Sequence, residues 1–310
     1  MRPLLLTLDA FNTLFHPHQP IPLQYASSAA NFNIPLTPAQ IQPAFRTSFK
    51  ILSASHPNYG RDLALRGEYA GPRQWWEDVI RGCFARALES NPDSKGQGKA
   101  DVPDALIQDL LERFASKRGY KLYDDVGPFF RELRSRRMNT GSQRKVVVGV
   151  VSNSDDRISP VLESLGVSIR DARAGEEKTR QGNDLPGFEE EREKHNSTSN
   201  SPSPGHGQEQ RDIDFILTSY QAGVEKPDRL IWDTALRTAQ QLEGQTETMA
   251  ESEEWERIHV GDDYKKDYRG AEDAGWRAYY LPREQDSTEA PQGTRTITTL
   301  LDLLPEIQGA

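Results

Sequence analysis

Cysteine, clusters of positive charge and long apolar runs are all scarce in this chain of 310 residues. Cys83 is the only cysteine, which excludes an intrachain disulfide and a zinc site made of cysteines, and predicts a reducing compartment. The formal net charge of -9 at pH 7, without a cluster of Lys or Arg, argues against a nucleic-acid partner. The longest apolar runs, residues 3–8 and 146–151, are too short to span a membrane.

Little sequence precedes the first apolar run. The run begins at Pro3, close to Met1, so we expect neither a signal peptide nor a transit sequence. Together with the single cysteine, this predicts a cytoplasmic or nuclear location and no membrane partner. The sequence makes no prediction of an oligomeric state.

The opening stretch, residues 3–15, is the most informative part of the chain. Its apolar run ends in Asp9, and Thr13 follows four residues later. If the run is a strand, Asp9 lies at its carboxyl end, where open α/β sheets bind their ligands. An Asp after a strand is also a common turn former or helix cap, so this stretch alone is open to both interpretations.

Strand and helix patterns alternate through most of the remaining chain. The further stretches with strand character are residues 145–151, 214–218, 257–261 and 277–281. Their alternation with helical segments predicts an α/β fold, with a Rossmann-like parallel sheet in a three-layer core.

Residues 16–119 have a different pattern, because their apolar residues recur at helical spacing between prolines and form no convincing strand. The predicted helices cover residues 23–33, 38–54, 74–88 and 103–117. We therefore expect an inserted helical domain, with a core made of residues 1–15 and 120–310. Within this core, residues 171–211 have the composition of a disordered insert, and residues 297–304 are expected to form a terminal helix.

Polar side chains follow three more of the predicted strands. Ser152 and Asn153 come directly after residues 145–151, and Lys226 precedes a helix that begins near a proline. The last group lies at and after the end of residues 257–261 and consists of Asp262, Asp263 and Asp267. Read singly, such residues are more often helix caps or surface groups than functional ones.

Carboxylates that crowd one crevice repel each other and raise each other's pKa unless a cation neutralises them. Asp9 and the three later aspartates are expected to meet at the same sheet edge. A hard cation with oxygen ligands, Mg²⁺ by preference, would neutralise this group.

The four motifs together resemble those of the haloacid dehalogenase superfamily. That family has an Asp-x-x-x-Thr, a strand-end Ser or Thr, a Lys and a Gly-Asp-x-x-x-x-Asp in this order, with a helical cap domain after the first. The resemblance covers nearly the whole chain. A more specific resemblance is to the group of the haloacid dehalogenase-like hydrolase domain-containing protein 3. This resemblance rests on residues 9–14, 59–60, 75–76, 151–153 and 225–228.

The resemblance implies a site for a small phosphorylated molecule. Asp9 would attack phosphorus and form an aspartyl phosphate, with Thr13 from the same motif, while Ser152, Asn153 and Lys226 hold the phosphoryl oxygens. The implied Mg²⁺ ligands are the Asp9 carboxylate, the backbone carbonyl of Phe11 and Asp262, with Asp263 or Asp267 reaching through water. In the cap, Tyr59, Trp75 and Trp76 are candidates for substrate selection, although core packing is the commoner role of such rings.

Phe11 departs from the phosphatases of this family, which carry there a second Asp that protonates the leaving oxygen. Loss of a general acid and base costs about 10²- to 10⁴-fold in rate, so we predict a slow phosphohydrolase or one restricted to acyl and aryl phosphates. The alternatives are a metal-containing binding protein and a 2-haloacid dehalogenase, whose carboxylate substrate the acidic cluster would repel.

The histidines and the cysteine have simpler interpretations. His16 and His18 follow the first strand and could replace the missing acid, but surface loop histidines are commoner. We expect His259 to be packed within its strand, and Cys83 to be an inert thiol in an apolar helix.

Overall fold

A computed structural model describes residues 2–90, 102–138, 144–170, 211–244, 255–283 and 290–308. The chain divides into two compact units. One draws on Met1–His16, Tyr120–Gly175 and Gln210–Ala310, and the other on Pro17–Gly119. Apart from Arg211, the predicted disordered insert lies outside the described residues.

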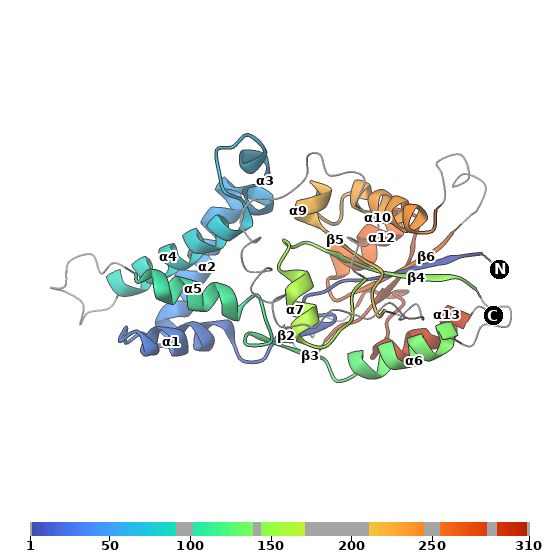
Figure 1. Ribbon diagram of the computed structural model, residues 1–310, viewed down its shortest axis with the longest axis horizontal. Helices are drawn as coiled ribbons and strands as arrows, with labels where there is room; N and C mark the ends of the chain where they lie inside the picture. Colours follow the sequence, from blue (N-terminus) through green and yellow to red (C-terminus); the bar gives the residue numbers. More distant parts are fainter. Residues whose placement is uncertain are drawn as a thin grey trace, which may run out of the picture. The chain divides into compact units, whose positions relative to one another are not determined.

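The first unit contains a parallel sheet with the spatial order β5-β4-β1-β6-β7 (Figure 1). Its strands are β1 (Leu4–Leu8), β4 (Val146–Ser152), β5 (Phe215–Thr218), β6 (Glu256–Gly261) and β7 (Arg277–Tyr280). All four pairings between neighbours are parallel, which confirms the α/β fold class.

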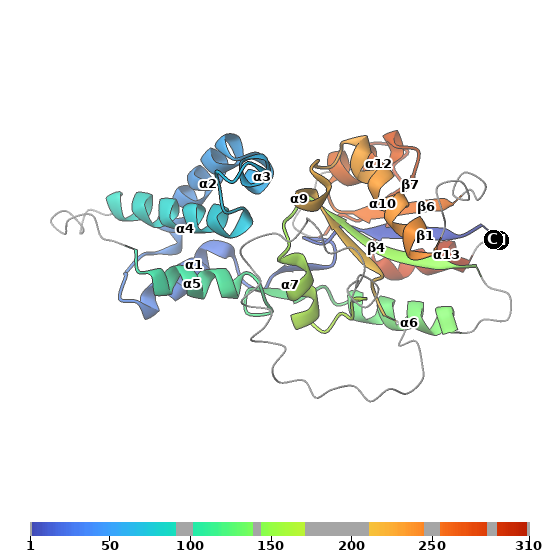
Figure 2. The same cartoon turned by 45° about the horizontal axis from the view of Figure 1, so that its top comes forward.

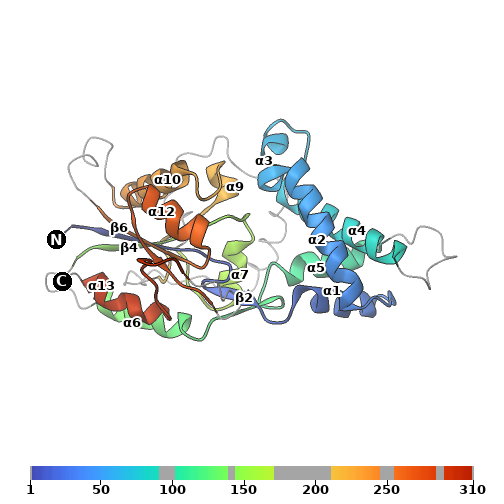
Figure 3. The same cartoon turned by 180° about the vertical axis from the view of Figure 1, so that it is seen from behind.

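Both faces of the sheet are buried, and this explains the unbroken apolar runs of the sequence. Leu4, Leu6 and Leu8 of β1 belong to one apolar cluster, whereas Leu5 belongs to the cluster on the opposite face. Figures 2 and 3 show the two layers of helices that cover these faces. One layer contains α6 (Val126–Met138), α7 (Ile158–Ser164) and α13 (Leu304–Gln308), and the other contains α10 (Arg229–Leu242) and α12 (Gly270–Asp273).

The strand order places a topological switch beside β1. From β1 the chain moves to β4 and β5 on one side, and then returns to β6 and β7 on the other. Helical connections therefore lead away from β1 and β6 in opposite directions, which opens a crevice at the carboxyl ends of these strands. Asp9 and Asp262 are the residues that follow those ends.

The second unit is helical. It contains α1 (Ile21–Asn31), α2 (Pro38–Ser55), α3 (Pro57–Leu65), α4 (Pro72–Glu89) and α5 (Asp104–Arg113). A reciprocal pair of hydrogen bonds between Thr37 and Gln40 caps the start of α2, and Phe84 of α4 stacks on Tyr25 of α1 inside the unit. Among the described residues, no helix is both long and apolar enough to cross a membrane.

Several local expectations were wrong. A short strand β2 (Phe15–Pro17) pairs with β3 (Tyr120–Leu122), although no strand was expected over residues 16–119. Three-residue strands are too short to show a periodic pattern. At the other end, the predicted helix over 297–304 starts later, as a 3₁₀ turn at Leu300–Leu303, because Thr299 caps it by accepting from the backbone of Leu301.

Two helical segments were not expected at all. One is α9 (Ser219–Ala222), a single turn capped by Thr218 directly after β5. The other is a π-helix, η3 (Tyr264–Arg269), which precedes α12. The wider turn of a π-helix has no signature in the sequence pattern, although it is common near functional sites.

Candidate active site

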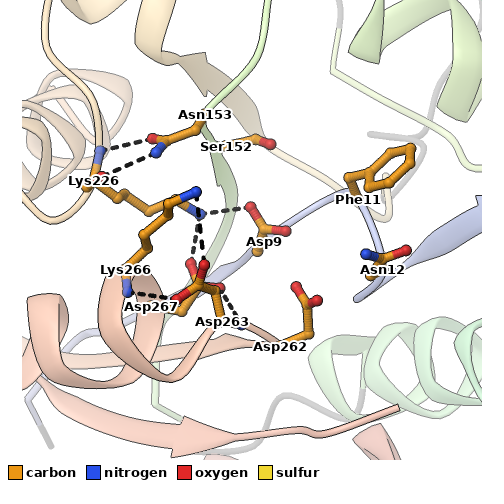
Figure 4. Close-up of a pocket in the computed structure, with 10 residues that line it drawn as sticks. All are labelled: Asp9, Phe11, Asn12, Ser152, Asn153, Lys226, Asp262, Asp263, Lys266 and Asp267. Atoms are coloured by element: carbon orange, nitrogen blue, oxygen red, sulfur yellow. Dashed lines mark hydrogen bonds and ion pairs between the residues drawn. The ribbon is translucent and has the colours of Figure 1, made fainter. Parts of the chain in front are cut away.

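The carboxyl ends of the strands surround a pocket in the first unit (Figure 4). It is lined by Asp9, Phe11, Asn12, Ser152, Asn153, Lys226, Asp262, Asp263, Lys266 and Asp267. The core residues that the sequence proposed for the site all line this pocket except Thr13. Asn12 and Lys266 line it without having been proposed.

Lys226 is the centre of the polar network in this pocket. Its Nζ lies 2.5 Å from Oδ1 of Asp9 and 2.6 Å from Oδ1 of Asp267. The ammonium also donates to the carbonyl oxygen of Val151 at 2.8 Å. Its three donors therefore have three acceptors, which compensates for burial of a charge that is only 3% exposed.

The loop that carries Lys226 is held by Asn153. The side-chain Oδ1 of Asn153 accepts from the backbone N–H of Lys226 at 2.6 Å, and Nδ2 donates to the backbone carbonyl of Lys226 at 2.9 Å. This closed pair joins the loop to the end of β4. The amide of Asn153 thus orients Lys226, and its role in phosphate binding stays a prediction.

Asp267 reaches the network from η3 because Gly261 leaves room for it. A Cβ atom at Gly261 would overlap the carboxylate of Asp267, so the glycine after Val260 allows this close approach. Oδ1 of Asp267 faces Lys226 and His259, and Oδ2 accepts from the backbone N–H of Asp263 at 3.0 Å. Both oxygens are therefore engaged within the protein.

Asp262 places a further carboxylate beside Asp9 in the pocket (Figure 4). One carboxylate oxygen from each of Asp9, Asp262 and Asp267 lies within 4.8 Å of the other two. The hydroxyl of Thr13, which is fully buried, lies 3.4 Å from Oδ1 of Asp262. Thr13 therefore orients a neighbouring carboxylate from behind and does not itself line the pocket.

Asp263 is committed to the start of η3. Its Oδ1 accepts from the backbone N–H groups of Lys265 and Lys266, both at 2.9 Å, and so caps the π-helix. Its Oδ2 lies 3.6 Å from Nζ of Lys266, a half-exposed side chain. Lys266 adds a second ammonium to the pocket, and its position directly before Asp267 was the only sequence signal for it.

The pKa values of Asp9, Asp262 and Asp267 differ widely, although the three carboxylates lie close together. Burial raises the pKa of Asp9 to about 6 in spite of the charge of Lys226. Burial and the charges of Asp9 and Asp267 raise the pKa of Asp262 to about 8. For Asp267, burial alone would raise the pKa, but the ammonium of Lys226 lowers it below the usual range. Asp267 is thus firmly ionised, whereas Asp262 and, to a smaller degree, Asp9 keep a proton to a higher pH than an ordinary aspartate.

Phe11 and Asn12 form the wall opposite Lys226. The Phe11 ring makes edge contacts with Phe15 and Tyr120, each with a centroid separation of 5.9 Å, and extends away from the carboxylates in Figure 4. Asn12 has a φ of 58°, in the left-handed region that Gly and Asn tolerate best. Asn is therefore one of the few residues that can occupy this position without strain.

The remaining candidates lie elsewhere in the chain. Tyr59, Trp75 and Trp76 meet in one aromatic cluster of the helical unit, with Tyr59 and Trp75 centroids 5.2 Å apart. Trp75 is 2% exposed, as a core residue would be, while Tyr59 has an unusual φ of 59°. Selection of substrate by these rings stays a prediction. Cys83 is buried, and burial raises the pKa of its thiol to about 12.

Comparisons with known proteins agree with the fold and the strand-end motifs. No family model matches the chain. An uncharacterized hydrolase of Schizosaccharomyces pombe is 27% identical over 276 residues, which cover 89% of each protein. The human haloacid dehalogenase-like hydrolase domain-containing protein 3 is 25% identical over 313 residues, covering 99% of this chain and 95% of that protein. Over nearly its whole length, the chain is therefore similar to haloacid dehalogenase-like hydrolases.

Two solved structures of haloacid dehalogenase-like proteins have a similar fold. A magnesium-bound haloacid dehalogenase-like hydrolase of Bacillus subtilis has a TM-score of 0.50 at 14% identity and covers 99% of each chain. A defluorinating L-2-haloacid dehalogenase has a TM-score of 0.53 at 12% identity, over 98% of this chain and 95% of that one. At these identities the two structures show a common fold alone, and the reaction must be argued from the site.

Proposed function

We propose that this haloacid dehalogenase-like protein is a Mg²⁺-dependent phosphohydrolase that acts on small phosphate compounds through an aspartyl phosphate on Asp9. The observation that carries the proposal is the position of Asp9. This buried carboxylate, 6% exposed, lies at the switch point of the sheet, with Lys226 on one side and Asp262 on the other. Such a group is oriented for attack on a ligand in the pocket.

The first step is the attack of Asp9 on phosphorus. A carboxylate oxygen forms a bond to phosphorus while the bond between phosphorus and the leaving oxygen breaks, and the leaving group keeps the electron pair. The hydroxyl of Ser152 is placed to donate to a phosphoryl oxygen, and the ammonium groups of Lys226 and Lys266 in the pocket lining would attract the phosphoryl group by their charge. In the second step, water attacks phosphorus and releases phosphate and the free Asp9 carboxylate.

Phe11 cannot act as a general acid for the leaving group. Its ring packs on Phe15 and Tyr120, and it can neither give nor take a proton. Groups that depart as stable anions, such as carboxylates and phenolates, need no proton from the enzyme. We therefore propose acyl and aryl phosphates as the substrate class, with slow turnover of alkyl phosphates.

The donors present fit a hard divalent cation. Carboxylate oxygens are the ligands that Mg²⁺ prefers. Burial and the charges of Asp9 and Asp267 raise the pKa of Asp262, because the single ammonium of Lys226 does not balance all three carboxylates. Asp9 and Asp262 are the proposed direct ligands, together with the carbonyl of Phe11, because Asp263 and Asp267 have other partners. The ion would lower the charge repulsion between Asp9 and an incoming phosphate. The related Bacillus subtilis protein binds magnesium.

The test compares p-nitrophenyl phosphate, acetyl phosphate and an alkyl phosphate with and without Mg²⁺, using the wild type, Asp9→Asn and Phe11→Asp. We expect turnover that needs both Mg²⁺ and Asp9, with the alkyl phosphate slowest. Phe11→Asp restores a carboxyl at the position of the missing acid and should raise alkyl phosphate turnover about tenfold or more. A matched control is Phe15→Leu, which disturbs the same ring cluster without adding a carboxyl.

Three results would contradict the proposal. Turnover that survives in Asp9→Asn would show that Asp9 is not the nucleophile. Absence of turnover in both the wild type and Phe11→Asp would favour a metal-containing binding protein instead. Metal-independent halide release from a 2-haloacid would favour the dehalogenase alternative, which Phe11 suggests and the acidic pocket opposes.

A further inference from the structure

Behind the pocket, a second polar group is buried on the sheet face that α10 and α12 cover. Thr7 of β1 and His259 of β6 are directly paired across the two strands. Both side chains are 0% exposed. Most neighbours on this face are apolar, and the His259 ring lies 4.6 Å from the ring of Trp232 between centroids. A buried imidazole in such surroundings is costly unless both nitrogens have partners.

Both nitrogens do have partners. Nδ1 of His259 lies 2.9 Å from the hydroxyl of Thr7, and Nε2 lies 3.2 Å from Oδ1 of Asp267. The same oxygen of Asp267 accepts from Nζ of Lys226 at 2.6 Å. Since an ionised carboxylate can only accept, the hydrogen between His259 and Asp267 must belong to Nε2.

The hydroxyl of Thr7 favours the same tautomer of His259 from the other side of the ring. It can donate to Nδ1 at 2.9 Å, whereas its other acceptor, the carbonyl of Ile258, is more distant at 3.3 Å. Donation from Thr7 to Nδ1 leaves the ring proton on Nε2, where it faces Asp267. Thr7, His259 and Asp267 thus form a line of hydrogen bonds that ends at Lys226.

We propose that His259, oriented by Thr7, is a positioning residue for the active site: its Nε2–H fixes the Asp267 carboxylate that holds the Lys226 ammonium against Asp9. His259 touches neither the pocket nor a ligand in it. It acts through Asp267, so the geometry of the Asp9 nucleophile depends on a residue on the covered face of the sheet. The effect on catalysis rests on the proposed phosphohydrolase function, but the hydrogen bonds do not.

The test uses the full chain labelled with ¹⁵N in histidine and lysine side chains. His259→Phe assigns the histidine signals by their loss, and we expect the wild-type spectrum to show His259 protonated on Nε2. The buried Lys226 ammonium should give a slowly exchanging signal that is retained in Trp232→Phe but lost in His259→Phe and Thr7→Val. Trp232→Phe is the matched control, because it alters packing against the same ring outside the line of hydrogen bonds.

Kinetics supply the second readout. We expect kcat for acetyl phosphate to fall about ten- to a hundredfold in His259→Phe and Thr7→Val, the usual cost of losing an orienting partner. Thr7→Ser restores the hydroxyl that Thr7→Val removes, and should recover most of the rate. A structural role alone would affect Thr7→Val and Trp232→Phe alike.

The two proposals fail in different ways. A His259 proton on Nδ1, or a Lys226 signal unchanged in His259→Phe, would overturn the positioning role whatever the activity is. If the wild type turns over no phosphate, the proposed function fails, and the spectra still decide the positioning role. If the wild type is active and His259→Phe equals Trp232→Phe in rate, the positioning role is overturned and the phosphohydrolase stands.

Discussion

The strand ends of the sheet and the aromatic cluster of the helical unit are two buried regions held together by opposite means. At the strand ends, an ammonium and several carboxylates lie in contact, and each has partners fixed by backbone or side-chain hydrogen bonds. In the helical unit, Trp75 and its neighbours are held by ring contacts. Charge pairing at the strand ends therefore requires particular charged groups at each position. Ring packing in the helical unit requires only side chains of the right size and shape.

The largest effect is expected at Asp9. Asp9→Asn keeps the shape of the side chain but removes the nucleophilic oxygen, so turnover of acetyl phosphate should fall about 10³-fold or more. The folded state should remain, because the amide still fits beside Lys226. Steady-state kinetics and thermal unfolding check this, with Asp233→Asn on the exposed side of α10 as the control.

Lys226→Met should show how strongly the strand ends depend on charge pairing. Methionine leaves Asp9 and Asp267 buried without their common cation, and removing one member of a buried pair costs about 3–5 kcal/mol. Urea unfolding measures the loss. The exposed Lys265→Met is the control, and equal stabilities of the two variants would show that the buried ammonium contributes nothing.

The two neighbouring tryptophans separate packing from selection in the helical unit. Trp75→Ala empties a fully packed position and should cost about 3–5 kcal/mol in unfolding free energy. Trp76 is only partly buried, so Trp76→Ala should cost about 1 kcal/mol. If Trp76 selects substrate, its variant changes the ratio of aryl to alkyl phosphate turnover. An unchanged ratio in both variants would restrict these rings to packing.

The smallest effect is a dependence of Mg²⁺ binding on pH. The pKa of Asp262 is raised to about 8 in the folded protein, from 3.8, so this group makes the metal-free protein progressively less stable as pH rises through that window. Mg²⁺ must displace a proton from Asp262 below the raised pKa but not above it. Thermal unfolding should therefore show a larger stabilisation by Mg²⁺ at pH 8 than at pH 6, and Asp262→Asn should abolish the difference.

The sequence predicted the strand ends well because each signal there is local. An apolar run followed by Asp9, Ser152 or Asp262 gives both the strand and the position of the polar group. Parallel pairing then brings these groups to one edge, whatever the details of the helices.

The orienting residues could not be found in this way. Thr7 and His259 lie within strands, where a polar side chain at alternate spacing looks like any other buried or exposed position. Their contact depends on the register between β1 and β6, which the sequence does not display. Lys266 lines the pocket from η3, a π-helix that the sequence pattern does not display.

The central claim is that Asp9 becomes phosphorylated during turnover. The direct measurement is to mix the protein with Mg²⁺ and acetyl phosphate, quench it in acid within the turnover time, reduce the acyl phosphate with borohydride and map the modified residue by mass spectrometry. We expect the modification at Asp9, in a larger fraction of the protein if the second step is slow and the intermediate accumulates. It should be absent in Asp9→Asn. Turnover without modification of Asp9, or modification of another carboxylate, would contradict it.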